Sequence, residues 1–232
     1  MKGVASMDER LSSFDLHMHT LHSKDGLNHP RDLFKLMKKH NLRGLAPTEH
    51  VRPSTLKVIE RDGKFIIPAC EFKCTDYGEV IGLFLNDYIE NRTFEEIAED
   101  IHSQGGIVVL PHPCDPLRKQ TAIRRGLPKS LIEKHVDLIE GINSRCIINL
   151  FNTRAQRLAA ILRKPMTAGS DGHSFLEVGH ARTWLQDIDT AEDIYQALKR
   201  GHTQITGYCS IFLCHLPTMV WQRARKIAYD RT

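Results

Sequence analysis

Histidine and carboxylate side chains recur in this chain directly after short apolar runs of the kind that form strands. The first run ends in His17-Met18-His19, where alternate residues of an extended chain share one face, so both imidazoles can reach one ion. Comparable side chains close four later runs, at His50, Glu71, His112 and the pair Asp171 and His173. Imidazoles and carboxylates gathered at one end of successive strands converge in three dimensions, and they are common metal ligands. The pattern predicts a site for more than one metal ion.

The elements that must position these side chains are short. Helical patterns separate several of the short strands. One helix opens with a capping box at Thr93, and another begins at Thr190. Ligands at the ends of seven or eight strands fit an α/β barrel of mainly parallel strands better than an open sheet, whose ligands gather at one switch point. The strand candidates are 14–19, 44–47, 65–70, 80–85, 107–110, 138–142, 166–169 and 181–185.

Length and composition favour one ordinary globular domain. The 232 residues suit a single barrel, and 41% hydrophobic with 26% charged residues gives no sign of disorder. A formal net charge of +4 suits an anionic substrate but is too weak to indicate a stable nucleic-acid partner. We expect no transmembrane segment, and the polar start of the chain with six irregularly spaced cysteines favours the reducing cytoplasm.

The ordered motifs resemble those of a known family. Asp15-Leu16-His17-Met18-His19-Thr20, followed by Ser23-Lys24-Asp25-Gly26, resembles the opening motif of the PHP (polymerase and histidinol phosphatase) family. Later motifs of that family are similar, in the same order, to Thr48-Glu49-His50, to 68–71, to Pro111-His112-Pro113 and to 169–173. The resemblance covers 14–207, between an N-terminal tail of 1–13 and a C-terminal helical tail of 208–232. It implies an α/β fold, a distorted (β/α)7 barrel of the PHP type.

The resemblance also implies the metal ligands. Two or three divalent ions, commonly zinc, manganese or iron, would be held by His17, His19, Asp25, His50, Glu71, His112, Asp171 and His173. This mixed nitrogen and oxygen set contains no thiolate that would impose tetrahedral zinc. The chain departs from the family pattern in two places, with Glu49 where an aspartate is usual and Glu79 where a histidine is frequent. Glu79 is either a ligand that favours manganese or iron over zinc, or a solvated residue at a strand edge.

Members of the family hydrolyse phosphate esters, so the resemblance implies a metal-dependent phosphoesterase. We expect metal-bound hydroxide to attack a phosphate ester of a small molecule or nucleotide. Asp171 and His173 are the catalytic candidates among the ligands, together with Arg118, which can bind phosphate bidentately. Substrate contacts are expected from Arg118, Asn143, Arg145 and Arg182, while Glu140 is a candidate partner of a ligand imidazole.

Two other functions stay open. A multinuclear site on a barrel can also hydrolyse a C–N or acyl bond, although no lysine stands at a strand end here to bridge two ions. The domain can instead be a regulatory module that binds metal without turnover, but retention of every motif argues against this. The tail of 208–232 is expected to dock on the barrel, with a dimer contact or a membrane-surface helix as alternatives. The oligomeric state is not predicted.

Overall fold

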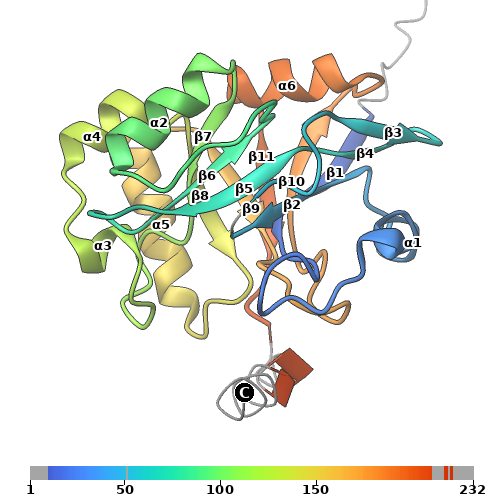
Figure 1. Ribbon diagram of the computed structural model, residues 1–232, viewed down its shortest axis with the longest axis horizontal. Coiled ribbons are helices and arrows are strands. Elements are labelled where there is room, and N and C mark those ends of the chain that lie inside the picture. Colours follow the sequence, from blue (N-terminus) through green and yellow to red (C-terminus); the bar gives the residue numbers. More distant parts are fainter. Residues whose placement is uncertain (1–9, 51, 211–216, 219, 222–232) are drawn as a thin grey trace, which may run out of the picture.

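The computed structural model describes residues 10–50, 52–210, 217–218 and 220–221 (Figure 1). Its strands are β1 (Leu11–Met18), β2 (Gly44–Glu49), β3 (Ile59–Arg61), β4 (Lys64–Ile66), β5 (Ala69–Lys73), β6 (Glu79–Leu83), β7 (Ile107–Leu110), β8 (Leu138–Asn143), β9 (Met166–Gly169), β10 (Ala181–Gln186) and β11 (Gln204–Gly207). They form one sheet in the order β11-β10-β1-β2-β5-β6-β7-β8-β9, with β4 beside β2 and β3 beside β4.

The two halves of this sheet curl toward each other until the barrel is nearly closed. The segment after β9 meets the end of β1, where Asp171 N donates to His17 O over 2.7 Å and His19 N donates to Gly172 O over 3.0 Å. Met18 and Gly172 form an isolated parallel bridge at the same place. The expected distorted α/β barrel is therefore confirmed.

The direction of the strands differs from the mainly parallel sheet that the sequence predicts. The pairs β1-β2, β2-β5, β7-β8 and β8-β9 are parallel, but β6 is antiparallel to both of its neighbours, and so is β10 to β1 and β11. The connection from β5 to β6 spans only residues 74–78, which is too short for the crossover that a parallel pair requires. Reversal of β6 brings its first residue, Glu79, beside the end of β5.

Several boundaries also differ. The expected strand 65–70 is divided between β4 and β5, and the hairpin of β3 and β4 was not predicted. Its turn carries Asp62 and Gly63 with φ of 51° and 64°, the left-handed pair typical of a type I′ turn. The first strand begins at Leu11 instead of Phe14, because Leu11–Phe14 pairs with β10.

Helices surround the sheet (Figure 1) and are η1 (Pro30–Asp32), α1 (Leu33–Lys39), α2 (Phe94–Ser103), α3 (Ala122–Arg125), α4 (Lys129–His135), α5 (Asn149–Leu162) and α6 (Ala191–Lys199). The capping box predicted at Thr93 is present at α2, and the helix predicted to begin at Thr190 is α6, which also carries a capping box. In α2 the buried face is the expected stripe of Phe94, Ile97, Ala98 and Ile101. The short helices α1, α3 and α4 were not predicted.

Burial explains which end of the barrel is free for chemistry. Phe14, Ile81 and Leu138 pack in one apolar cluster with Ile194 of α6, while a second cluster joins the sheet to α2, α4 and α5. Phe14 lies near the start of β1 and His17 near its end, so α6 seals one end of the strands and leaves the other end to polar side chains.

No helix within the described residues is both long and apolar enough to cross a membrane. Most of the predicted C-terminal helical tail lies outside the described residues, which include only 208–210, 217–218 and 220–221 of it.

Candidate metal centre

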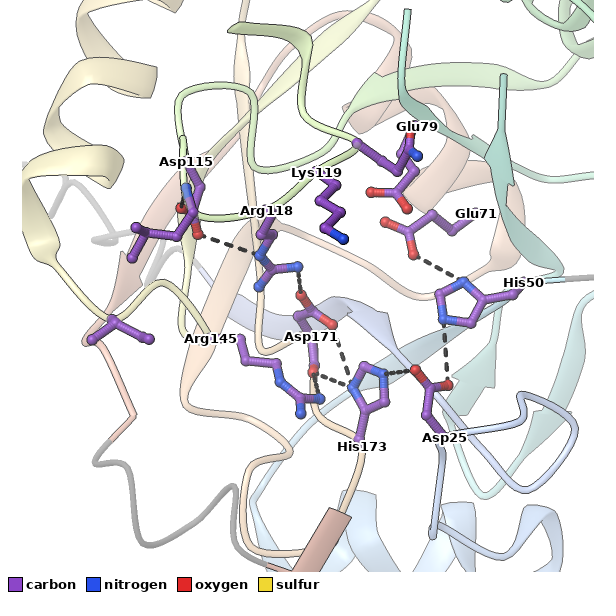
Figure 2. Close-up of a pocket in the computed structure, with 13 residues that line it drawn as sticks. Asp25, His50, Glu71, Glu79, Asp115, Arg118, Lys119, Arg145, Asp171 and His173 are labelled. Carbon is purple, nitrogen blue, oxygen red and sulfur yellow. Dashed lines mark hydrogen bonds and ion pairs between the residues drawn. The ribbon is translucent and has the colours of Figure 1, made fainter. Parts of the chain in front are cut away.

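The predicted ligands come together at the open end of the barrel. His17 and Glu71 lie within β1 and β5, most of the others follow the end of a strand or lie in the loop after it, and Glu79 opens the reversed strand β6. Figure 2 shows several of these side chains pointing into one cavity of about 410 Å³, into which Arg118, Lys119 and Arg145 also project. Segments far apart in the chain therefore supply one site, as the sequence predicts.

One group of potential ligand atoms surrounds Glu71. Its Oε1 lies 3.1 Å from His112 Nε2 and 3.5 Å from His17 Nε2, while its Oε2 lies 3.2 Å from His50 Nδ1. His17, Glu71 and His112 are all buried, and each offers an atom close enough to the other two for a shared ion. The two oxygens of Glu71 thus face different histidines of the centre.

A second group surrounds His19. Its Nε2 lies 3.4 Å from Asp171 Oδ1 and 3.3 Å from His17 Nε2, and its ring is 4.2 Å from that of His173. Asp25 closes this side, with Oδ1 3.4 Å from His50 Nε2 and Oδ2 3.3 Å from His173 Nε2. Two sets of three residues in this group have potential ligand atoms close enough together to bind one ion. They are His19 with His50 and His173, and His17 with His19 and Asp171.

Glu140 fixes the orientation of one imidazole in this centre. His17 Nδ1 donates to Glu140 Oε1 over 2.9 Å, so Nε2 is the nitrogen that faces Glu71 and Asp171. A carboxylate behind a ligand imidazole sets its tautomer and raises its basicity. The sequence-based suggestion that Glu140 bonds a neighbouring ligand is consistent with this contact.

The carboxylates and imidazoles of the centre shift each other's pKa values. Burial lowers the pKa of His17, but the carboxylates of Glu140, Asp171 and Glu71 outweigh it and raise that pKa well above its ordinary value. Burial and the nearby His173 lower the pKa of His19 to about 3, so this imidazole is neutral and its lone pair is free for a metal. Buried carboxylates and imidazoles at these distances are donors that divalent ions take, so the donor set fits the metals that the family implies.

Arg118 links the ligands to the cavity wall. Its Nη1 donates to Asp171 Oδ2 over 2.5 Å, its Nη2 to Asn143 Oδ1 over 3.2 Å, and its Nε lies 3.3 Å from Asp115 Oδ2. Burial raises the pKa of Asp171, but Arg118 and His17 together hold it well below its ordinary value. Asp115 was not predicted, because it lies in a loop, where a spacing of three residues before Arg118 is not a helical signal.

Arg145 and Asn143, which are predicted to contact the substrate, lie beside Asp171. Asn143 Nδ2 lies 3.0 Å from Glu140 Oε2 and 3.3 Å from Asp171 Oδ2, and Asn143 Oδ1 accepts from the backbone N of Arg145. The guanidinium of Arg145 reaches the backbone oxygen of Asp171 over 3.5 Å and also Thr218 of the C-terminal segment. With Nε also 3.9 Å from Glu177 Oε1, the guanidinium of Arg145 is held at the cavity from several sides.

Two predicted residues behave differently. Glu79 lines the cavity with Oε2 3.8 Å from His112 Nε2 and a side chain 20% exposed, so it faces the centre from its edge. Arg182 does not line this cavity, and the prediction that it contacts the substrate is not supported. Residues along β10 alternate between two faces, with Ala181 and Thr183 buried and Arg182 turned outward, where its Nε donates to Gly179 O.

Close backbone packing brings the centre together. A Cβ at Gly169 would lie 2.3 Å from His17 Cβ and 3.0 Å from Glu140 Oε1, so only glycine permits β9 to approach β1 here. His112 and Asp171 have φ of 28° and 53°, which non-glycine residues seldom adopt. Such conformations concentrate at functional sites, where the surrounding structure holds them.

Glu49 has a role that the sequence did not reveal. It is fully buried, and it accepts hydrogen bonds of 2.5 Å from the hydroxyls of both Thr20 and Ser23. These residues belong to the turn that carries Asp25. The carboxylate therefore ties the end of β2 to the loop after β1.

Comparison with known proteins finds one family model and related sequences. A family model described as PHP-associated matches residues 149–203. Uncharacterized protein MJ0417 of Methanocaldococcus jannaschii is 34% identical over 177 residues, which cover 75% of this chain and 71% of that protein.

Solved structures share the fold at low identity. A two-domain protein from Bacteroides vulgatus, described as containing a predicted PHP-like metal-dependent phosphoesterase, has a TM-score of 0.69 and 19% identity, covering 89% of this chain and 68% of that chain. The lesion-specific endonuclease PfuEndoQ from Pyrococcus furiosus has a TM-score of 0.59 and 18% identity, covering 84% and 58%. With its ordered motifs, its barrel and its identity to the archaeal relative, the chain belongs to the PHP family.

Proposed function

We propose that this protein is a metal-dependent phosphoesterase that acts on a phosphorylated small molecule or a nucleotide. The observation that carries the proposal is the shared cavity, in which Arg118, Lys119 and Arg145 face the group of buried imidazoles and carboxylates (Figure 2). Phosphate esters need both parts, because their charge must be neutralised and a nucleophile must be generated near neutral pH.

The proposed ligands are the residues predicted from the motifs, with Glu79 at the edge of the centre. Divalent ions held there would lower the pKa of water and offset negative charge on phosphoryl oxygens. The ligand set of five imidazoles and several carboxylates suits zinc, manganese or iron. The ligands are His17, His19, Asp25, His50, Glu71, Glu79, His112, Asp171 and His173.

The cationic wall supplies the contacts to the substrate. Arg118 is fixed by Asp171, Asn143 and Asp115, so its guanidinium loses little conformational entropy when it meets a phosphate oxygen. Lys119 and Arg145 line the same cavity from other directions. Three cations around one opening match an anion with several equivalent oxygens.

The same cationic wall favours phosphate over an amide. Hydrolysis of a C–N or acyl bond develops negative charge on one oxygen, which one or two donors can stabilise. Three neighbouring cations fit better with a phosphate, which carries several charged oxygens. The cavity of about 410 Å³ lies within the usual range for small-molecule sites. A phosphodiester in a nucleic acid is the further alternative, since PfuEndoQ shares the fold.

The proposal is tested by metal analysis joined to a substrate screen. Purified protein is analysed for bound metal and assayed, with manganese or zinc, on phosphomonoesters, a single-stranded and a duplex oligonucleotide, and simple amides. We expect bound metal and release of inorganic phosphate from monoesters. His112→Asn should abolish release, whereas the matched variant of the exposed His202, His202→Asn, should retain it. Amide cleavage without phosphate release, or bound metal with no turnover of any substrate, would contradict the proposal.

A further inference from the structure

A second cavity lies outside the barrel, where β10 and β11 meet the C-terminal end of α1. Its volume is about 410 Å³, and its lining includes His40, His180, Arg182, Trp184 and Tyr208. None of these side chains belongs to the proposed metal centre, and the lining shares no residue with the cavity at the barrel end. The second cavity is therefore a separate place for a ligand.

Three nitrogen-bearing side chains in this cavity have donors to spare. Arg182 Nε donates to Gly179 O over 2.9 Å. Among the described residues, this side chain makes no other hydrogen bond, so both Nη groups can bind a ligand. His40 Nε2 is buried and meets no partner among the described residues. His180 bonds Ser210 Oγ through Nδ1 over 2.8 Å, which leaves its Nε2.

The electrostatic balance of the cavity favours an anion. No carboxylate is found among the described residues that line it. Burial lowers the pKa of His40, and the positive charges of Lys39, His180 and Arg182 lower it further. Burial also lowers the pKa of His180 against the opposing carboxylate of Glu177, which accepts hydrogen bonds from His173 N, Ser174 N and Ser174 Oγ. The guanidinium of Arg182 is therefore the fixed positive charge of the cavity, and no carboxylate of the lining that the structure describes would oppose an oxyanion beside it.

Aromatic rings form the remaining wall. The ring of Tyr208 lies 4.9 Å from that of His180 at an interplanar angle of 33°, and Tyr208 is 60% exposed. Trp184 lies nearby, held by a 2.7 Å hydrogen bond from its Nε1 to Thr206 Oγ1. An exposed aromatic face beside a cationic group provides a surface on which a planar ring of a ligand can stack.

We infer that this outer cavity binds the phosphate group of a small ligand that also carries a planar ring, at a site distinct from the metal centre. Arg182 binds two oxygens of the phosphate through its guanidinium, and His180 donates to a third through Nε2. The ring of the ligand stacks on Tyr208. Arg182, which the sequence assigned to the substrate of the metal centre, thus belongs to a different ligand site.

Trp184 makes the inference measurable, because the only other tryptophan in the chain is Trp221. In a Trp221→Phe background, the fluorescence of Trp184 is recorded during titration with inorganic phosphate and with phenylphosphonate, whose C–P bond a phosphoesterase does not hydrolyse. Potassium chloride at matched ionic strength is the blank. We expect a saturable change with both anions and tighter binding of phenylphosphonate.

Variants assign the response to the cavity. Arg182→Ala should weaken binding at least tenfold, about the loss of one charge-assisted hydrogen bond. His180→Gln gives an independent variant if Arg182→Ala fails to fold by circular dichroism. The exposed arginine control Arg157→Ala and the metal-centre variant Arg118→Ala should both keep the response. No saturable change, or a change lost in Arg118→Ala and kept in Arg182→Ala, would overturn the site, while equal binding of the two anions would overturn the stacking on Tyr208.

Discussion

Glu140 contacts two of the proposed ligands at once, because its Oε1 accepts from His17 Nδ1 over 2.9 Å and its Oε2 accepts from the backbone N of His112 over 2.8 Å. One carboxylate at the end of β8 therefore sets the position of ligands that arrive on β1 and after β7. Such a residue acts through the ligands it holds, without contacting the reacting atoms.

Glu140→Gln should lower metal affinity roughly tenfold to 100-fold, the range found when the partner of a ligand imidazole is lost. The amide keeps the size of the side chain but can no longer accept both hydrogen bonds. Metal affinity is measured by competition with a chelator. Glu133→Gln, on the exposed face of α4, is the matched control, and equal affinity in the two variants would disprove the positioning role.

Arg118→Ala should reduce kcat/KM for a phosphomonoester by about 100-fold, because it removes charge-assisted hydrogen bonds of roughly 1.5 to 3 kcal/mol. Arg118→Lys should recover only part of this loss, since an ammonium cannot bridge Asp171 and Asn143 as the guanidinium does. Steady-state kinetics at saturating metal tests both variants beside Arg157→Ala. Full activity of the alanine variant would remove Arg118 from the mechanism.

Metal removal should destabilise the fold as well as end activity. Glu71 and Asp171 are buried among the histidines, so an ion that binds only the folded state adds about 2.7 kcal/mol at a free concentration 100 times its Kd. Calorimetry with and without chelator should show a lower Tm after metal removal. The same treatment should change the Tm of His112→Asn much less, and an equal fall in that variant would mean that the metal binds elsewhere.

Glu79→His should shift the metal preference toward zinc. The carboxylate faces His112 from the edge of the centre, and an imidazole there would make the donor set softer and less negative. Activity of the metal-free protein is compared after addition of zinc or manganese. An unchanged ratio of the two activities would show that Glu79 does not contact the ions.

Asp137 should control stability at acid pH. Burial raises its pKa, but the side chain of His102, the backbone N of Val108 and Lys199 hold it below the ordinary value of 3.8. A depressed carboxyl pKa stabilises the fold above the unfolded pKa, and that contribution disappears as the pH falls through the folded value.

Asp137→Asn should therefore cost about 1 to 2 kcal/mol at pH 7 and progressively less as the pH falls below about 4. Urea unfolding across this range measures the difference, with the exposed residue variant Glu60→Gln as control. A cost that does not depend on pH would assign the effect to packing instead of charge.

The sequence was sufficient for the elements whose signal is local. The strands 107–110 and 166–169 and the capped helices after Thr93 and Thr190 lie where their patterns predict, because capping and apolar periodicity are short-range properties. The reversal of β6 was missed, since strand direction depends on connection length and pairing partners. The hairpin of β3 and β4 was also missed, although the Asp62-Gly63 dipeptide was a signal for it.

The residues of the candidate site also differ in whether local sequence was enough to predict them. Residues next to strand ends, such as His17 and His112, could be placed because parallel strands deliver them to one edge. Arg182 could not be placed, because the face that it occupies depends on the register of β10 against β1. The partners Asp115 and Glu49 were not recognised, because an acid that accepts hydrogen bonds from a loop has no distinctive spacing.

The reach of Glu49 has a consequence for how this chain can evolve. An aspartate at position 49 is one methylene shorter, so its oxygens would fall short of the Thr20 and Ser23 hydroxyls that the glutamate meets at 2.5 Å. Either the turn moves inward, carrying Asp25 with it, or two buried hydroxyls lose their acceptor. The length of the side chain at one strand terminus and the hydroxyls of the adjoining turn therefore constrain each other, and changing either one alone should loosen the turn.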